Sequence, residues 1–138
     1  MSDKEANVRG KHIFDEARVY DRAKVTGDAK LFGEAKVCDN AEVHDNAKVY
    51  DNAKVSCDAW VIGHARVSGH ARVSDNAYVG GKAVVRDYAW VTGDAEVEGE
   101  AKIGGRAVIL GGTWDGSEGE ILEGTWIAPG VPYEGDGK

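Results

Sequence analysis

The chain has 138 residues and a mass of 14.7 kDa, which is the length of one domain. Its formal net charge of −7 is concentrated at one end, because residues 115–138 hold six acidic residues and one lysine. The remainder is close to neutral, so it lacks the long-range attraction for nucleic acid that a basic domain has, and nucleic acid is not expected as a partner.

No apolar run is long enough to span a bilayer, and residues 1–10 lack the apolar core of a secretory signal. We therefore expect a cytoplasmic protein without a membrane partner. The two cysteines, Cys38 and Cys57, are too few for a disulfide framework, and we expect both to be reduced.

Residues 1–12 are polar and irregular, and we interpret them as an N-terminal cap. A strict repeat follows. Every sixth residue from Ile13 to Ile109 is Ile, Val or Leu, over 17 consecutive units. The fourth residue after each of these is Ala in all units but the last, which has Thr113. Self-similarity at a fixed period indicates a repeat architecture.

The order of residues within a unit predicts β-structure. In the segment 47–50, Ala47 and Val49 share one face while Lys48 and Tyr50 share the other, which is the period of a half-buried strand. The other two residues of the unit form a corner, and the first of them is Gly or Asp in 16 of the 17 units. Both residue types tolerate positive φ. Each unit thus predicts a four-residue strand and a two-residue corner, and excludes a helix.

Outward aromatic residues set the number of units per coil. A period of 18 residues places eight of the nine in three columns, which are Phe14-Phe32-Tyr50, Trp60-Tyr78-Trp114 and Trp90-Trp126. Periods of 12 or 24 residues scatter them over more columns. Three units per coil define a triangular prism of three parallel sheets, with about six to seven coils.

The repeat continues towards the C-terminus and predicts an all-β domain over residues 13–133. The residues expected inside there are Ile121, Thr125, Ile127, Val131 and Tyr133, and ILGGTW at 109–114 recurs as ILEGTW at 121–126. The unit DGSEGE would place Asp115 inside, so we predict a short acidic loop at 115–120, followed by a disordered tail at 134–138. The acidic residues Asp115, Glu118, Glu120 and Glu123 are candidates for binding a partner.

The units VYDNAK, VTGDAE, IGGRAV and especially IAPGVP (127–132) resemble the hexapeptide-repeat superfamily, over about 120 of the 138 residues. The resemblance implies a left-handed parallel β-helix and trimeric association. Many members are acyltransferases that use CoA or ACP thioesters, and some are carbonic anhydrases of the gamma class. The near-uniform units are most similar to uncharacterised members named as transferases. Because the repeat residues form the scaffold, they say little about function.

Histidines are the first candidates for chemistry. His44 points outward beside Glu42, with Trp60 and Ile62 expected one coil above, and a carboxylate beside an imidazole can form a general base. The pair is equally well explained as two ordinary outward residues. His64 and His70 occupy second corner positions, where we interpret them as residues that tolerate positive φ. His12 falls in the cap.

No metal site is expected, because His44, His64 and His70 do not converge as three zinc ligands must. No cofactor is expected either, and a CoA thioester would bind only if the chain is an acyltransferase.

Outward columns are the second source of candidates. One sheet carries the basic column Arg18, Lys36, Lys54 and Arg72, and another carries Lys30, Lys48 and Arg66 beside the column Phe14, Phe32 and Tyr50. Such columns are explained as solvated faces whose lysine stems cover the sheet. A second interpretation is a site for single-stranded nucleic acid or a CoA phosphate.

Two apolar patches predict an oligomer. They comprise Trp90, Val108, Leu110 and Trp126 on one sheet, and Trp60, Ile62 and Tyr78 on the adjacent one. Monomers seldom expose such patches. Two different faces that meet around a threefold axis would bury both, so we predict a homotrimer.

Three functions remain open from the sequence. The first is a non-catalytic scaffold or protein-binding module that presents its side-chain columns. The second is an acyltransferase of the hexapeptide-repeat family, with His44 and Glu42 as catalytic residues. The third is an inhibitor or regulator of another protein that acts through the acidic C-terminal region.

Overall fold

A computed structural model describes residues 13–132 of the chain. The predicted cap at 1–12 with His12, the predicted tail at 134–138, and Tyr133 lie outside the described residues. The described strands are β1 (Arg18–Val19), β2 (Lys24–Val25), β3 (Lys30–Leu31), β4 (Lys36–Val37), β5 (Glu42–Val43), β6 (Lys48–Val49), β7 (Lys54–Val55), β8 (Trp60–Val61), β9 (Arg66–Val67), β10 (Arg72–Val73), β11 (Tyr78–Val79), β12 (Val84–Val85), β13 (Trp90–Val91), β14 (Glu96–Val97), β15 (Lys102–Ile103), β16 (Val108–Ile109), β17 (Thr113–Trp114), β18 (Glu120–Ile121), β19 (Thr125–Ala128) and β20 (Val131–Pro132).

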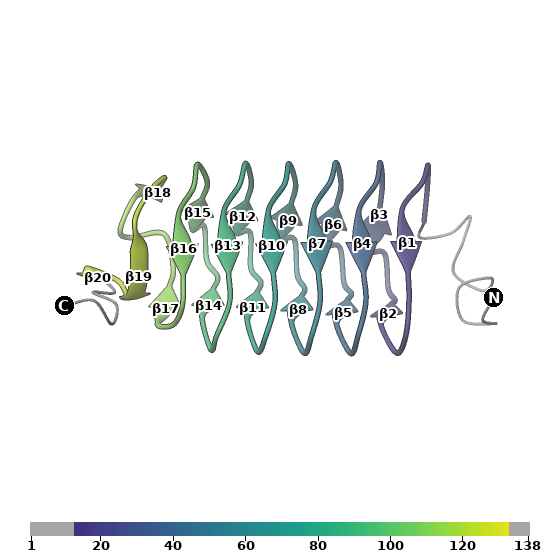
Figure 1. The fold of residues 1–138 in the computed structure, drawn as a ribbon, viewed down its shortest axis with the longest axis horizontal. Coiled ribbons are helices and arrows are strands. Elements are labelled where there is room, and N and C mark those ends of the chain that lie inside the picture. Colours follow the sequence, from purple (N-terminus) through teal and green to yellow (C-terminus); the bar gives the residue numbers. More distant parts are fainter. Residues whose placement is uncertain (1–12, 133–138) are drawn as a thin grey trace.

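These strands stack into three sheets along a rod (Figure 1). Sheet 1 has the order β1-β4-β7-β10-β13-β16-β19-β20, sheet 2 runs from β2 to β17 in steps of three, and sheet 3 runs from β3 to β18 in the same way. Neighbouring strands are parallel and 18 residues apart over most of the rod, as in the pairs Lys36↔Lys54 and Val37↔Val55. The prediction of a parallel β-solenoid with three units per coil is confirmed, and the six strands of sheets 2 and 3 give about six coils.

Most strands are two residues long, shorter than the predicted four. The backbone bonding between coils nevertheless continues on both sides of each strand. The N–H of Tyr50, for example, donates to the carbonyl of Val67 at 3.0 Å. Among the described residues, no helix is long and apolar enough to cross a membrane.

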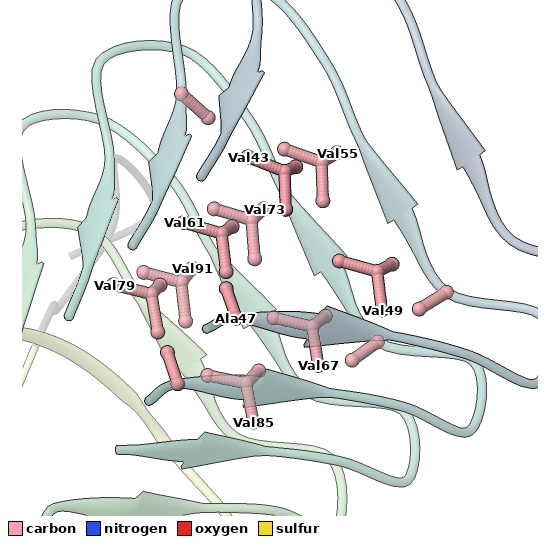
Figure 2. Close-up of a cluster of buried hydrophobic side chains, with 14 of the residues drawn as sticks. Val43, Ala47, Val49, Val55, Val61, Val67, Val73, Val79, Val85 and Val91 are labelled. Carbon is pink, nitrogen blue, oxygen red and sulfur yellow. The ribbon is translucent and has the colours of Figure 1, made fainter. Parts of the chain in front are cut away.

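The interior contains mainly valine and alanine. Val43, Val61 and Val79 stack at one corner of the prism, and Val49, Val67 and Val85 stack at another (Figure 2). All six are fully buried, as is Ala47 between the valine columns. The coil is narrow, so its interior accepts only short side chains where the backbone turns, and this explains the strict alternation of Val and Ala.

Each corner is a β-turn whose first central residue has positive φ. All sixteen first-corner positions from 15 to 105 have φ between 56° and 66°, eight of them occupied by Gly. In these sixteen corners the second residue does not share this conformation, so the interpretation of His64 and His70 as positive-φ residues is wrong. Gly and Asp are selected at the first position because they tolerate the left-handed region best.

Aspartates at the first corner position tie successive coils together. The Asp51 carboxylate accepts the N–H of Gly69 at 3.1 Å, and the Asp87 carboxylate accepts that of Gly105 at 2.9 Å. This N–H is not used by the backbone ladder, so the carboxylate fills a position that water would otherwise take. At Asp75, hydrogen bonds from the Thr92 hydroxyl and the Gly93 N–H lower the pKa of the carboxyl group below its ordinary value.

The register changes in the last coil. Val97 pairs with Trp114 and Ile109 pairs with Trp126, each 17 residues apart, while Ile103 still pairs with Ile121. The cause is the length of the connections. Residues 110–112 and 122–124 form three-residue connections where regular coils have four, and residues 115–119 form one of five.

This shift corrects five predictions for the last coil. Trp114 is 1% exposed in the core, and Trp126 packs partly buried against the core, although both were predicted to point outward. Thr113 and Ile127, predicted inside, are exposed, and Thr125, also predicted inside, is half-buried opposite the outward Val108. A slip of one residue turns every side chain of a strand to its other face, so one deleted corner residue accounts for each exchange.

The repeated hexapeptide ILGGTW and ILEGTW is the local cause of the shift. In both copies the residue immediately before Thr-Trp is a glycine of positive φ, Gly112 at 83° and Gly124 at 90°. The indole N–H of Trp114 donates to the carbonyl of Gly111 at 2.8 Å, and that of Trp126 donates to the carbonyl of Glu123 at 2.9 Å. The hexapeptide is therefore a motif that shortens the coil and turns a tryptophan inward.

The segment IAPGVP at 127–132 is not a further coil. It forms a hairpin in which β20 pairs antiparallel with β19, around Pro129 and Gly130, whose φ is 78°. Val131, predicted inside, is 44% exposed at this end of the rod. This segment supplied the strongest sequence match to the hexapeptide signature, but its structure is an end hairpin.

Candidate functional site

His44 and Glu42 lie together on the outer face of sheet 2. The His44 Nε2 atom is 3.6 Å from a Glu42 carboxylate oxygen, and its Nδ1 atom is 3.7 Å from an oxygen of Asp45. The ring of Trp60 stands edge-on to the imidazole, with the ring centres 5.7 Å apart. Both distances exceed a hydrogen bond, so the imidazole is surrounded by acids without being fixed by either one.

The predicted patch on sheet 2 is continuous. Trp60 pairs with Tyr78 in register, and Trp60 is 41% exposed. The Tyr78 ring lies over the backbone of Gly80, where an added Cβ would meet its Cε1 atom at 2.8 Å and the Cγ1 atom of Ile62 at 3.3 Å. The absent side chain of Gly80 thus lets tyrosine and isoleucine form one apolar surface, and partial burial raises the pKa of Tyr78.

The predicted patch on sheet 1 is smaller than expected. Trp90 is 41% exposed and pairs with Val108, but Val108 pairs in turn with Thr125, because Trp126 faces the core. Leu110 is half-buried beside Val108. The patch therefore ends in a threonine where a second tryptophan was predicted.

Polar contacts hold Trp90 in place. Its indole N–H donates to the Ser74 hydroxyl at 3.1 Å, and the Arg72 guanidinium carbon lies 5.9 Å from its ring centre. Ser74 donates to Thr92 at 3.2 Å, and Thr92 donates to Asp75 at 2.6 Å. An exposed tryptophan fixed in one orientation loses little further entropy when a partner covers it.

Three of the four acidic residues proposed for partner binding already have contacts within the chain. Asp115 accepts the N–H and the hydroxyl of Ser117 at 2.9 and 2.7 Å, and these bonds lower its pKa. Glu118 accepts the N–H of Gly116, and Glu120 pairs with Arg86, which follows β12 two coils away. Glu123 is exposed in the last connection. Residues 115–119 thus form a bonded turn.

Sheet 3 carries a groove that the sequence did not define. The column Lys30, Lys48 and Arg66 lies in register across β3, β6 and β9. On one side of this column a hollow of about 540 Å³ contains Phe32 and Tyr50, and on the other a hollow of about 460 Å³ contains Asn46 and His64. The sequence predicted that the basic column and the aromatic residues share this face, but it did not predict that the corner residues Asn46 and His64 lie beside them.

The described residues contain no cluster of metal-ligating side chains. In residues 13–132 no group of three or more His, Cys, Asp or Glu side chains is placed to hold a metal ion. Cys38 and Cys57 are free thiols, both half-buried, and burial raises the pKa of Cys38.

The fold and these surfaces define a β-solenoid repeat protein whose variable chemistry lies in its outward columns. A family model described as the YdcK beta solenoid repeat matches residues 65–81, so this segment is similar to that repeat. No curated protein and no solved structure matches the chain significantly. The resemblance to transferases of the hexapeptide-repeat superfamily gains no support from these comparisons and stays a hypothesis.

Proposed function

We propose that the chain is a non-catalytic scaffold that assembles as a homotrimer and presents its remaining surface to a protein partner. The observation that carries the proposal is the exposure of two oriented tryptophans on adjacent sheets. Trp60 on sheet 2 and Trp90 on sheet 1 are each 41% exposed within apolar patches. Covering both at once requires sheet 1 of one protomer to meet sheet 2 of the next, which closes into a ring.

Charge supports the same pairing of faces. Sheet 1 bears four cations in register at the coils before Trp90: Arg18, Lys36, Lys54 and Arg72. Sheet 2 bears Glu42 below Trp60 and Glu96 above Tyr78. A basic column that meets carboxylates and aromatic faces gains ion pairs and cation–π contacts, which also fix the register of the two rods.

The test is the mass of the particle in solution. We expect multi-angle light scattering to give three times 14.7 kDa for the natural chain and 14.7 kDa for Trp90→Asp, because the substitution removes the aromatic anchor of the interface and puts a charged group in its place. The matched control is Tyr88→Asp. Tyr88 is 59% exposed, stacks on His70, and lies at the corner between sheets 3 and 1. Unchanged mass in Trp90→Asp, with intact circular dichroism, would remove the proposed interface.

An acyltransferase is the second candidate, favoured by the approach of His44 to Glu42. In that case the natural chain transfers an acetyl group from acetyl-CoA, and His44→Ala slows the transfer about 100-fold or more, since the general base is lost. His70→Ala is the control, because His70 stacks on Tyr88 away from Glu42. The scaffold proposal predicts no turnover, so acetyl transfer that depends on His44 would replace it.

A further inference from the structure

The two hollows on sheet 3 share the Lys48 and Arg66 side chains, which stand between them. The hollow of about 540 Å³ is lined on its far side by Phe32 and Tyr50, and that of about 460 Å³ by Asn46 and His64. Volumes of this size are typical of small-molecule sites. A ligand centred on the two cations would therefore reach an aromatic wall on one side and hydrogen-bonding groups on the other.

The cations of this column form no ion pair in the described part of the chain. Lys30, Lys48 and Arg66 occupy directly opposed positions on strands about 4.8 Å apart, where like charges repel. Within residues 13–132, no carboxylate oxygen lies within 4.0 Å of their side-chain nitrogens. The carboxylates of Asp15 and Asp51 line the first hollow, where each accepts a backbone N–H, from Gly33 and Gly69. Asp28 lines the second hollow and forms no ion pair with the column either. An anion between the cations would relieve this repulsion.

The aromatic wall is preformed. Phe14 and Phe32 stack with ring centres 5.4 Å apart and planes inclined by 22°, and Tyr50 meets Phe32 edge-on at 6.4 Å. Lys30 and Lys48 each share a strand segment with an outward ring, Phe32 and Tyr50, whereas Ser68 takes that place beside Arg66. Phe32 and Tyr50 remain half-exposed, so part of the wall is open to a planar group.

We propose that this groove binds a nucleotide. The phosphate lies between the Lys48 ammonium and the Arg66 guanidinium, within reach of Lys30 and His64, and the base packs against Tyr50 and Phe32. Phosphate suits the site because several cations flank one position and arginine donates in a fork that fits its oxygens. The base suits it because every nucleobase has a face that stacks on an aromatic ring.

The extent of the column limits the ligand to one or a few nucleotides. Three strands span about 10 Å, and the chain has a net charge of −7, which gives no steering toward a long polyanion. The site lies on sheet 3, which the proposed trimer leaves free, so it does not depend on that assembly.

The probe is ATP, titrated by calorimetry at low salt. We expect saturable binding that Lys48→Ala and Arg66→Ala each weaken about tenfold, through loss of a charge-assisted hydrogen bond. Tyr50→Ser is expected to weaken ATP about fivefold or more and to leave tripolyphosphate unaffected. The matched controls are Lys54→Ala and Tyr20→Ser. Lys54 follows an Asp-Asn-Ala sequence, as Lys48 does, but it lies on sheet 1. Neither is expected to change ATP binding.

Further titrations distinguish a free nucleotide from a nucleotide within a single-stranded nucleic acid. Tighter binding of a short oligothymidylate than of a mononucleotide, with the same dependence on Lys48, identifies a single strand as the natural ligand, and equal binding identifies a free nucleotide. Three results would overturn the proposal. Tripolyphosphate could bind as tightly as ATP, ATP binding could be unchanged in Lys48→Ala and Arg66→Ala, or the titration could give no heat at millimolar ATP. Light scattering on the same variants keeps this outcome separate from that of the trimer.

Discussion

Gly105→Asp is expected to lower the free energy of unfolding by about 3 kcal/mol or more, whereas Gly33→Asp is expected to cost about 1 kcal/mol. The two glycines stand in the same corner column, with φ of 56° and 62°. Asp15, Asp51 and Asp87 alternate with glycine in that column at nearly the same φ. The backbone conformation alone therefore does not separate the two substitutions.

The atom above each glycine separates them. A Cβ at Gly33 would lie 3.0 Å from the N atom of Asp51, and a carboxylate there could accept that N–H, as Asp15 accepts the N–H of Gly33. A Cβ at Gly105 would lie 2.1 Å from the carbonyl oxygen of Leu122, which overlaps it and repels a carboxylate. Leu122 is in this position because its carbonyl accepts the N–H of Arg106 at 2.9 Å in the shortened coil.

The measurement is chemical denaturation of both variants at one protein concentration, followed by circular dichroism. Equal losses for Gly33→Asp and Gly105→Asp would mean that the last coil keeps the regular register. Gly93 and Gly99 share the situation of Gly105, since a Cβ there would lie 2.2 Å from the Leu110 oxygen and 2.5 Å from the Asp115 oxygen. All three corners beneath the shortened coil thus require glycine.

The regular part of the rod could be predicted from the sequence because one pattern determines it at every coil. Alternation placed Val49 inside and Lys48 outside, and the 18-residue period gave the neighbours Lys30 and Arg66, which the strand pairing confirms. A structure in which each unit contacts only its copies carries little information beyond the unit itself.

The last coil could not be predicted from the 18-residue period, because strand register depends on the length of each corner and not on the hydrophobic pattern alone. Thr113 and Trp114 can each fill an inward position, and only the loss of one residue in the corner decides between them. The uninterrupted run of Gly93, Gly99 and Gly105 was a usable signal, since earlier corners mix glycine with aspartate.

The candidate sites divide in a similar way. The sequence placed Glu42, His44 and Trp60 on one face because strand register fixes all three, and the structure brings them together. The groove on sheet 3 needed Asn46 and His64 at a corner. The direction of a corner side chain depends on turn geometry and rotamer, which hexapeptide spacing does not encode.

Trp114→Ala is expected to lower the free energy of unfolding by about 3–5 kcal/mol, the range for deleting a large aromatic side chain from a core. Trp114 is 1% exposed, bonds to the Gly111 carbonyl, and meets Trp126 edge-on with ring centres 6.3 Å apart. Its removal leaves a cavity at the end of a narrow core and also an unpaired carbonyl, and the short connection at 110–112 cannot move a second side chain in to fill it.

Thr113→Ala is the decisive comparison, because the uninterrupted hexapeptide frame places Thr113 inside and Trp114 outside. With the observed register, Thr113 is exposed opposite Glu96, and its truncation is expected to change the stability by about 0.5 kcal/mol or less. Urea denaturation of both variants gives the ratio of the two losses. A larger loss for Thr113→Ala would restore the regular frame, and Trp114 would then join Trp60 and Tyr78 on the face that we assign to the trimer.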